Sequence, residues 1–183
     1  FNDGNFISAK LGHFAFDSLS NSVADYSRFI GNSVNTFSDR QGDSEFIFSY
    51  QGWSQKYSAQ FKLTKYIRVT TDFGLIENTA APIDNKGSYF RFKPIYNFGD
   101  VEYSLGYSNF EVERDATVGF YQPRSFFNVN HRGESYEFKY HDLRSDLVVQ
   151  ATYGRMNEIN INQIAQRDSM ETFVLMIRKF YEI

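Results

Sequence analysis

The chain has 183 residues, no cysteine and a formal net charge of −3, and it carries 20 Phe and 13 Tyr. The lack of cysteine excludes disulfides, thiolate metal sites and thiol catalysis, and the lack of a basic block gives no reason to expect a nucleic-acid partner. A chain so rich in aromatic residues is not disordered. Its length suits one domain, which we place at residues 1–183.

Alternation of apolar and polar residues is the main structural signal, and it begins loosely over residues 6–16. The stretch Asp17–Ser44 is rich in Ser, Asn and Asp. This composition predicts a long loop, or two ragged strands around Tyr26–Ile30 and Ser33–Phe37.

The clearest alternation places Tyr57, Ala59, Phe61 and Leu63 opposite four polar neighbours, which predicts a half-buried strand. A polar insertion with helical potential is expected at Arg155–Ser169. Further strands with the same alternation are predicted at residues 67–75, 90–96, 101–107, 135–142, 146–154 and 171–183.

Nearly every predicted strand has one polar face, and the sequence between strands holds short turns rather than helical spacers. Antiparallel strands fit this pattern, and parallel βαβ units do not. So many strands in one domain close into a barrel or split into a sandwich. We expect an all-β fold, an antiparallel up-and-down β-barrel of about 10–12 strands of the outer-membrane type.

Periodicity alone does not decide which face is outside. In a soluble barrel or sandwich the aromatic face is the core, whereas in an outer-membrane barrel it meets lipid. Strand lengths near ~9–11 residues, Tyr and Phe at strand ends, and turns of very different length favour the membrane interpretation. The alternative is a soluble β-barrel or sandwich that binds a carbohydrate or another ligand.

A tight aromatic turn contains Gly119, Phe120, Tyr121, Pro123 and Phe126. It resembles a signature near the end of the barrels of bacterial cellulose- and exopolysaccharide-export porins, in which tetratricopeptide repeats precede a C-terminal barrel. Gln122 replaces the usual Ser of that signature. The resemblance extends over residues 117–183, through two strands, a polar insertion and an aromatic-ended last strand. The family's barrel is larger than the strand count here allows, and the tetratricopeptide repeats are not present in this sequence. The alternatives are therefore a trimmed portion of such a protein or a smaller related barrel with the same closing strands.

The resemblance implies a non-enzymatic barrel of the bacterial outer membrane that passes, or supports passage of, an exopolysaccharide through a polar, aromatic-containing lumen. Its implied partners are membrane lipid, the polysaccharide and periplasmic export components, with no cofactor. Both signs of charge occur on the polar faces, so no strong ion selectivity is predicted. The lumen candidates are Lys62, Arg68, Asp72, Arg91, Lys93, Glu102, Glu137, Lys139, His141, Asp146 and Gln150.

The motif turn offers a second group of candidates: Gly119, Tyr121, Pro123 and Arg124. Tyr121 and Arg124 could contact substrate, or Pro123 could only fix the backbone for the next strand. Trp53 is either a sugar-stacking platform or an interface anchor.

Catalytic and metal chemistry has little support in the sequence. His13, His131 and His141 form no ligand pair, so we expect no metal site. His141 and Asp142 point to opposite faces of a strand and therefore do not make a dyad. A barrel enzyme acting on lipid through His131 or His141 is the least favoured hypothesis.

Overall fold

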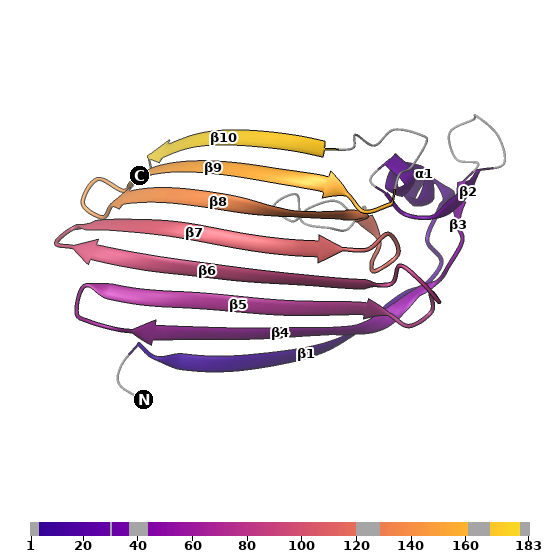
Figure 1. The fold of residues 1–183 in the computed structure, drawn as a ribbon, viewed down its shortest axis with the longest axis horizontal. Coiled ribbons are helices and arrows are strands. Elements are labelled where there is room, and N and C mark those ends of the chain that lie inside the picture. Colours follow the sequence, from indigo (N-terminus) through magenta and orange to yellow (C-terminus); the bar gives the residue numbers. More distant parts are fainter. Residues whose placement is uncertain (1–3, 30, 37–43, 120–128, 161–168, 180–183) are drawn as a thin grey trace.

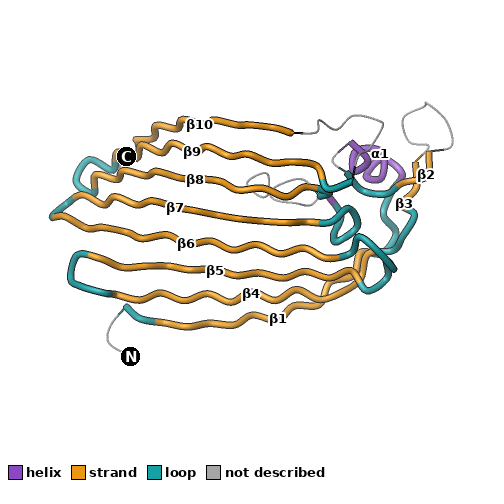
Figure 2. The backbone as a smooth tube through the Cα atoms, viewed as in Figure 1, coloured by secondary structure: helices purple, strands orange, loops and turns teal. Residues whose placement is uncertain are grey.

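The computed structural model describes residues 4–29, 31–36, 44–119, 129–160 and 169–179. Within these ranges the chain forms ten strands and one helix (Figures 1 and 2). They are β1 (Phe6–Phe16), α1 (Asn21–Phe29), β2 (Val34–Thr36), β3 (Ser44–Phe46), β4 (Tyr50–Lys62), β5 (Ile67–Asn78), β6 (Lys86–Phe98), β7 (Val101–Val112), β8 (His131–Asp142), β9 (Leu147–Glu158) and β10 (Ser169–Lys179).

Eight strands form one antiparallel sheet in the order β1-β4-β5-β6-β7-β8-β9-β10, which Figure 1 shows as a single curved layer. Each strand pairs with its successor in the chain, except that β1 pairs with β4 after an excursion through α1, β2 and β3. The predicted all-β antiparallel fold is therefore confirmed. The sheet is not closed into a barrel, because β1 and β10 remain at its two edges.

The alternation of apolar and polar residues predicted the long strands correctly, but the prediction for the segment after residue 154 was wrong. We predicted a helical insertion from Arg155, whereas β9 continues to Glu158 and pairs with β10 as far as Asn157. Continued pairing satisfies the backbone of these polar residues, which overrides their weak helical preference. Residues 161–168 of that insertion lie outside the described part. The last strand is confirmed from Glu171 to Lys179, and residues 180–183 are not described.

The strand predicted around Tyr26–Ile30 is wrong, because residues up to Phe29 form α1. Ser20 precedes the helix, and its carbonyl and hydroxyl oxygens both accept from Val23 N, at 3.0 and 3.4 Å. Such a cap satisfies the free amides of a first turn. Gly31, with φ of 114°, lies just beyond the helix in the left-handed region that glycine favours. The other ragged strand is confirmed as β2.

In the described part of the chain, no helix is both long enough and apolar enough to cross a membrane.

The two ends of the sheet differ in their connections. At one end lie the short turns 63–66, 99–100 and 143–146, together with the start of β1 and the end of β10 (Figure 1). The strand ends at the other end of the sheet are joined by longer stretches of sequence, residues 17–49, 79–85, 113–130 and 159–168. We call these the turn end and the loop end of the sheet.

The buried core of the described residues is concentrated at the loop end, where Tyr50, Phe110 and Val118 are almost fully buried. A polar network holds it together. Asn32 Nδ2 donates to the Tyr50 hydroxyl at 3.0 Å, and that hydroxyl donates to Asp115 Oδ1 at 2.8 Å. Burial, followed by the nearby Asp115 carboxylate, raises the pKa of Tyr50 above its ordinary value. The Tyr50 hydroxyl therefore remains a donor.

Candidate functional site

Side-chain alternation gives the sheet two faces of opposite character. Directly paired residues on neighbouring strands share a face. The face that carries Phe73, Phe90 and Phe138 is called the aromatic face, and the face that carries Arg68 and Glu137 is called the polar face.

The aromatic face is exposed rather than buried. Nineteen large hydrophobic side chains on this face of the described strands are 39% to 75% exposed, Leu105 among them at 60%. With about 150–250 Å² per large side chain, this exposes on the order of 1,500 Å² of hydrophobic surface, against about 300–600 Å² for the largest patch of a typical soluble monomer. No other described element covers this face.

Aromatic rings border the aromatic face in two rows that cross the strands. Ring centroids within the rows are 5.4 Å apart for Tyr107–Tyr136 and for Tyr103–Tyr140. The loop-side row is Tyr57, Phe73, Phe90, Tyr107, Tyr136, Tyr153 and Phe173. It shifts by two residues between β6 and β7, where Tyr107 is directly opposite Phe92. The turn-side row is Tyr66, Tyr96, Tyr103 and Tyr140.

Between the two rows lies an apolar band in which the aromatic face of the described strands has no Asp, Glu, Lys or Arg. On β6 the row members Phe90 and Tyr96 are about 20 Å apart along the strand, and on β7 Tyr103 and Tyr107 are about 13 Å apart, at ~3.3 Å per residue. The uncharged stretch of this face continues on β6 past Tyr96 to Phe98, about 26 Å from Phe90. Charged residues begin just outside the loop-side row. They are Glu77, Lys86, Glu111, Arg132, Glu134, Arg155 and Glu171.

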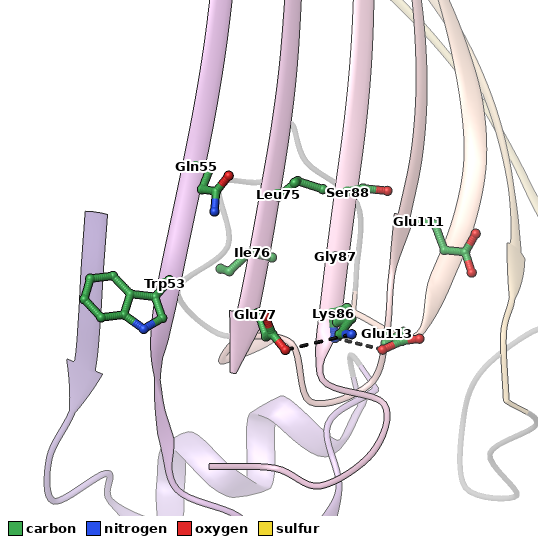
Figure 3. A pocket seen from close by; sticks show the side chains of 10 residues that line it. All are labelled: Trp53, Gln55, Leu75, Ile76, Glu77, Lys86, Gly87, Ser88, Glu111 and Glu113. Carbon is green, nitrogen blue, oxygen red and sulfur yellow. Dashed lines mark hydrogen bonds and ion pairs between the residues drawn. The ribbon is translucent and has the colours of Figure 1, made fainter. Parts of the chain in front are cut away.

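A shallow hollow of about 420 Å³ marks this charged margin (Figure 3). Lys86 lies between two carboxylates there: its Nζ is 3.9 Å from Glu77 Oε1, and its backbone N donates to Glu113 Oε2 at 2.8 Å. Trp53 lines the same hollow and packs edge-on against His13, with ring centroids 4.9 Å apart. Trp53 thus lies on the aromatic face, beside the charged margin, where an interface anchor would be placed.

The polar face is crossed by ion pairs that bridge strands two apart. Arg68 on β5 contacts Glu102 on β7 at 2.7 Å, and Lys93 on β6 contacts Glu137 on β8 at 2.8 Å. The second pair passes over Gly106, where an added Cβ would lie 3.2 Å from Glu137 Cβ. These pairs hold the long side chains across the sheet.

Ten of the eleven lumen candidates lie on this polar face, as the alternation along the strands predicted. The exception is Asp146, which lies in the β8–β9 turn with φ of 49° and approaches His141 Nε2 at 3.4 Å. Nine of them are Lys62, Arg68, Asp72, Arg91, Lys93, Glu102, Glu137, Lys139 and His141. Gln150 joins them and donates to Glu137 Oε2 at 2.9 Å.

The sequence reasoning overlooked several charged residues of the polar face, notably Lys10 and Lys56. Only the register of strand pairing, which the sequence does not give, places these two lysines together. Lys10 is directly opposite Lys56, and Lys56 Nζ lies 3.6 Å from Asp72 Oδ1 on the same face. With these included, the described strands place eight Lys and Arg against four Asp and Glu on this face, a difference of four positive charges. They are Lys10, Lys56, Lys62, Arg68, Arg91, Lys93, Lys139 and Arg178, against Asp72, Glu102, Glu137 and Glu158.

Two hollows are open on the polar face. One, of about 570 Å³, is lined by Arg91, Lys93 and Glu137. The other, of about 520 Å³, is lined by Lys10, Lys56 and Arg91. Both are large enough for a sugar ring, and both are lined by groups that can replace water at hydroxyls or anions.

The motif turn is represented in the described residues only by Gly119, which is buried and donates its N–H to Asn32 Oδ1 at 2.7 Å. Tyr121, Pro123 and Arg124 lie outside the described residues. His131 is buried at the loop end, with Nδ1 2.9 Å from the carbonyl of Val129. Among the described residues no group of three or more potential metal ligands occurs.

Comparison of this chain with protein-family models, with curated proteins and with solved structures finds no match in any of the three.

Proposed function

We propose that this chain forms part of the wall of a β-barrel in the bacterial outer membrane, with its aromatic face against lipid and its polar face toward water. The observation that carries the proposal is the uncharged, ring-bordered band on an uncovered face. A transmembrane barrel has an apolar band about 25 Å tall flanked by aromatic girdles. The uncharged stretch of the aromatic face on β6, from Phe90 to Phe98, is about 26 Å long along the strand.

The ends of the sheet support the same placement. Outer-membrane barrels have short periplasmic turns and longer extracellular loops, and this sheet has turns of two to four residues at one end only. Inside a bilayer every backbone N–H and C=O must be paired. The free edges of β1 and β10 therefore require partner strands in the membrane.

We further propose that the polar face borders a path for an exopolysaccharide. The resemblance of residues 117–183 to export porins supports this choice, as do hollows lined by polar groups. A polymer moves along such a surface when each contact is weak and repeated. Eight strands closed on themselves would be filled by their own side chains, so the path needs a wall of more than these eight strands.

Conductance tests the passage directly. The chain reconstituted in a planar bilayer should conduct ions, and an oligosaccharide added to one side should reduce the current.

Cysteine pairs test whether β1 and β10 of one protomer meet and close the eight strands on themselves. Ala9→Cys on β1, combined in turn with Phe173→Cys, Leu175→Cys or Ile177→Cys on β10, should give no disulfide within a single protomer. An intramolecular disulfide without conductance would mean that the eight strands form a closed, filled barrel. That result would contradict passage of a polysaccharide but not the placement of the aromatic face against lipid.

Solubility separates this proposal from the soluble carbohydrate-binding alternative. Lipid or detergent should be required to keep the aromatic face from aggregating. A protein that is monodisperse and folded without detergent would contradict the membrane placement.

A further inference from the structure

The positive charge of the polar face is concentrated on one half of the sheet. On β1, β4, β5 and β6 this face carries six cationic side chains against one carboxylate, Asp72, although the whole chain has a net charge of −3. The six are Lys10, Lys56, Lys62, Arg68, Arg91 and Lys93. Local positive potential on an acidic protein selects for anions near that surface.

Two cross-strand pairs of like charge lie within this half. Lys10 is directly opposite Lys56, and Lys62 is directly opposite Arg68. Like charges placed directly opposite each other destabilise a sheet. Arg68 is relieved by Glu102 and Lys56 by Asp72, but neither Lys10 nor Lys62 forms an ion pair with another described residue. A bound anion would remove this repulsion.

The hollow of about 520 Å³ provides a shaped place for such a ligand. Lys10, Lys56 and Arg91 line it, together with the carboxylate Asp72 and the ring of Tyr89. At Gly74 an added Cβ would lie 2.1 Å from Cε1 of Tyr89, so the Tyr89 ring lies directly over that glycine. Lysine and arginine donate to carboxylate or phosphate oxygens, and an aromatic ring offers a flat surface to a sugar.

We propose that the polar face of β1, β4, β5 and β6 binds acidic polysaccharide, a sugar polymer that carries carboxylate or phosphate groups. This rests on the proposed function, because it names the chemistry of the polymer that borders the polar face. It also replaces the expectation of no strong ion selectivity, which counted charges of both signs without their register. The exposed lysines hold each anionic group weakly, as movement of the polymer requires.

Titration calorimetry on the protein in detergent micelles tests the proposal with three probes: oligogalacturonate, a phosphorylated dextran oligomer and neutral maltoheptaose. We expect at least one of the two acidic probes to bind about tenfold more tightly than maltoheptaose or better. Its affinity should fall as the salt concentration rises. The tighter of the two acidic probes identifies the carboxylate or the phosphate as the preferred group. Equal binding of the neutral probe, or no binding of any acidic probe, would overturn the proposal.

Charge-removing variants locate the site. Lys10→Gln and Lys62→Gln should each weaken the acidic probe about two- to fivefold, the range expected for one exposed charge. Lys86→Gln removes the same charge from the opposite face of β6 and should leave affinity unchanged. If all three variants weakened the acidic probe equally, or if Lys10→Gln and Lys62→Gln left its affinity unchanged, the proposed location of the binding site would be wrong.

The two proposals fail separately. Membrane insertion together with a preference for the neutral probe would reject the acidic ligand alone. Binding of the acidic probe by a monodisperse, detergent-free protein would reject the membrane placement alone.

Discussion

Leu105→Arg separates a lipid-facing surface from a wet one, because the two environments predict effects of different size. Leu105 is 60% exposed and lies between Tyr103 and Tyr107 on the aromatic face of β7, opposite Phe138. Each aromatic row is therefore about 6.6 Å away along the strand, at ~3.3 Å per residue. This places the substitution inside the apolar band.

In a bilayer, Arg at such a depth costs about 2–4 kcal/mol. The ratio of folded to unfolded protein would fall roughly 30- to 700-fold, since each 1.4 kcal/mol is a factor of ten. In water the same substitution at an exposed position would change stability by only about 0.5 kcal/mol in either direction.

The assay is guanidinium unfolding in lipid vesicles, followed by the fluorescence of Trp53, the single Trp of the chain. Asn109→Arg is the matched control, since Asn109 shares the strand and the face but lies beyond Tyr107, directly opposite Phe90 of the loop-side row. It should cost about 0–1 kcal/mol. Equal costs at Leu105 and Asn109, or no cost at either, would refute the lipid-facing assignment.

Three further predictions follow from other parts of the molecule. Asp115→Ala leaves the buried Tyr50 hydroxyl without its acceptor, so it should cost about 1–3 kcal/mol and speed proteolysis of the loop end, with the sheet still protected. Gly74→Ala should cost about 1–3 kcal/mol through overpacking against Tyr89, and the penalty measured by denaturant unfolding should shrink in a Tyr89→Ala background. Trp53 should be quenched by lipids brominated near the headgroup, and an unquenched Trp53 would remove it from the interface.

The long strands and the composition of each face could be predicted from the sequence, because both follow from a period of two. Phe138 and Lys139 are adjacent in the chain and must face opposite ways in any strand. What the period cannot supply is which face is covered, since that depends on the surroundings of the sheet. It also cannot supply closure, which depends on whether the edges of β1 and β10 meet.

The helix and the charge pattern were missed for different physical reasons. α1 has nine residues, too few for a helical period to stand out, and its ends depend on Ser20 and Gly31. The positive half of the polar face depends on register, because Lys10 and Lys56 are far apart in sequence and meet only through strand pairing. Contacts of that kind are invisible to a scan along the chain.

Spin labels at two neighbouring positions test most directly which face of the sheet meets lipid and which meets water. The chain has no cysteine, so Phe138→Cys and Lys139→Cys each give a single labelling site on β8. In protein reconstituted in liposomes, we expect the label at 138 to be relaxed by oxygen, which concentrates in lipid, and the label at 139 by a water-soluble nickel complex. The reverse pattern, or strong access of the nickel complex to both labels, would contradict the lipid-facing aromatic surface.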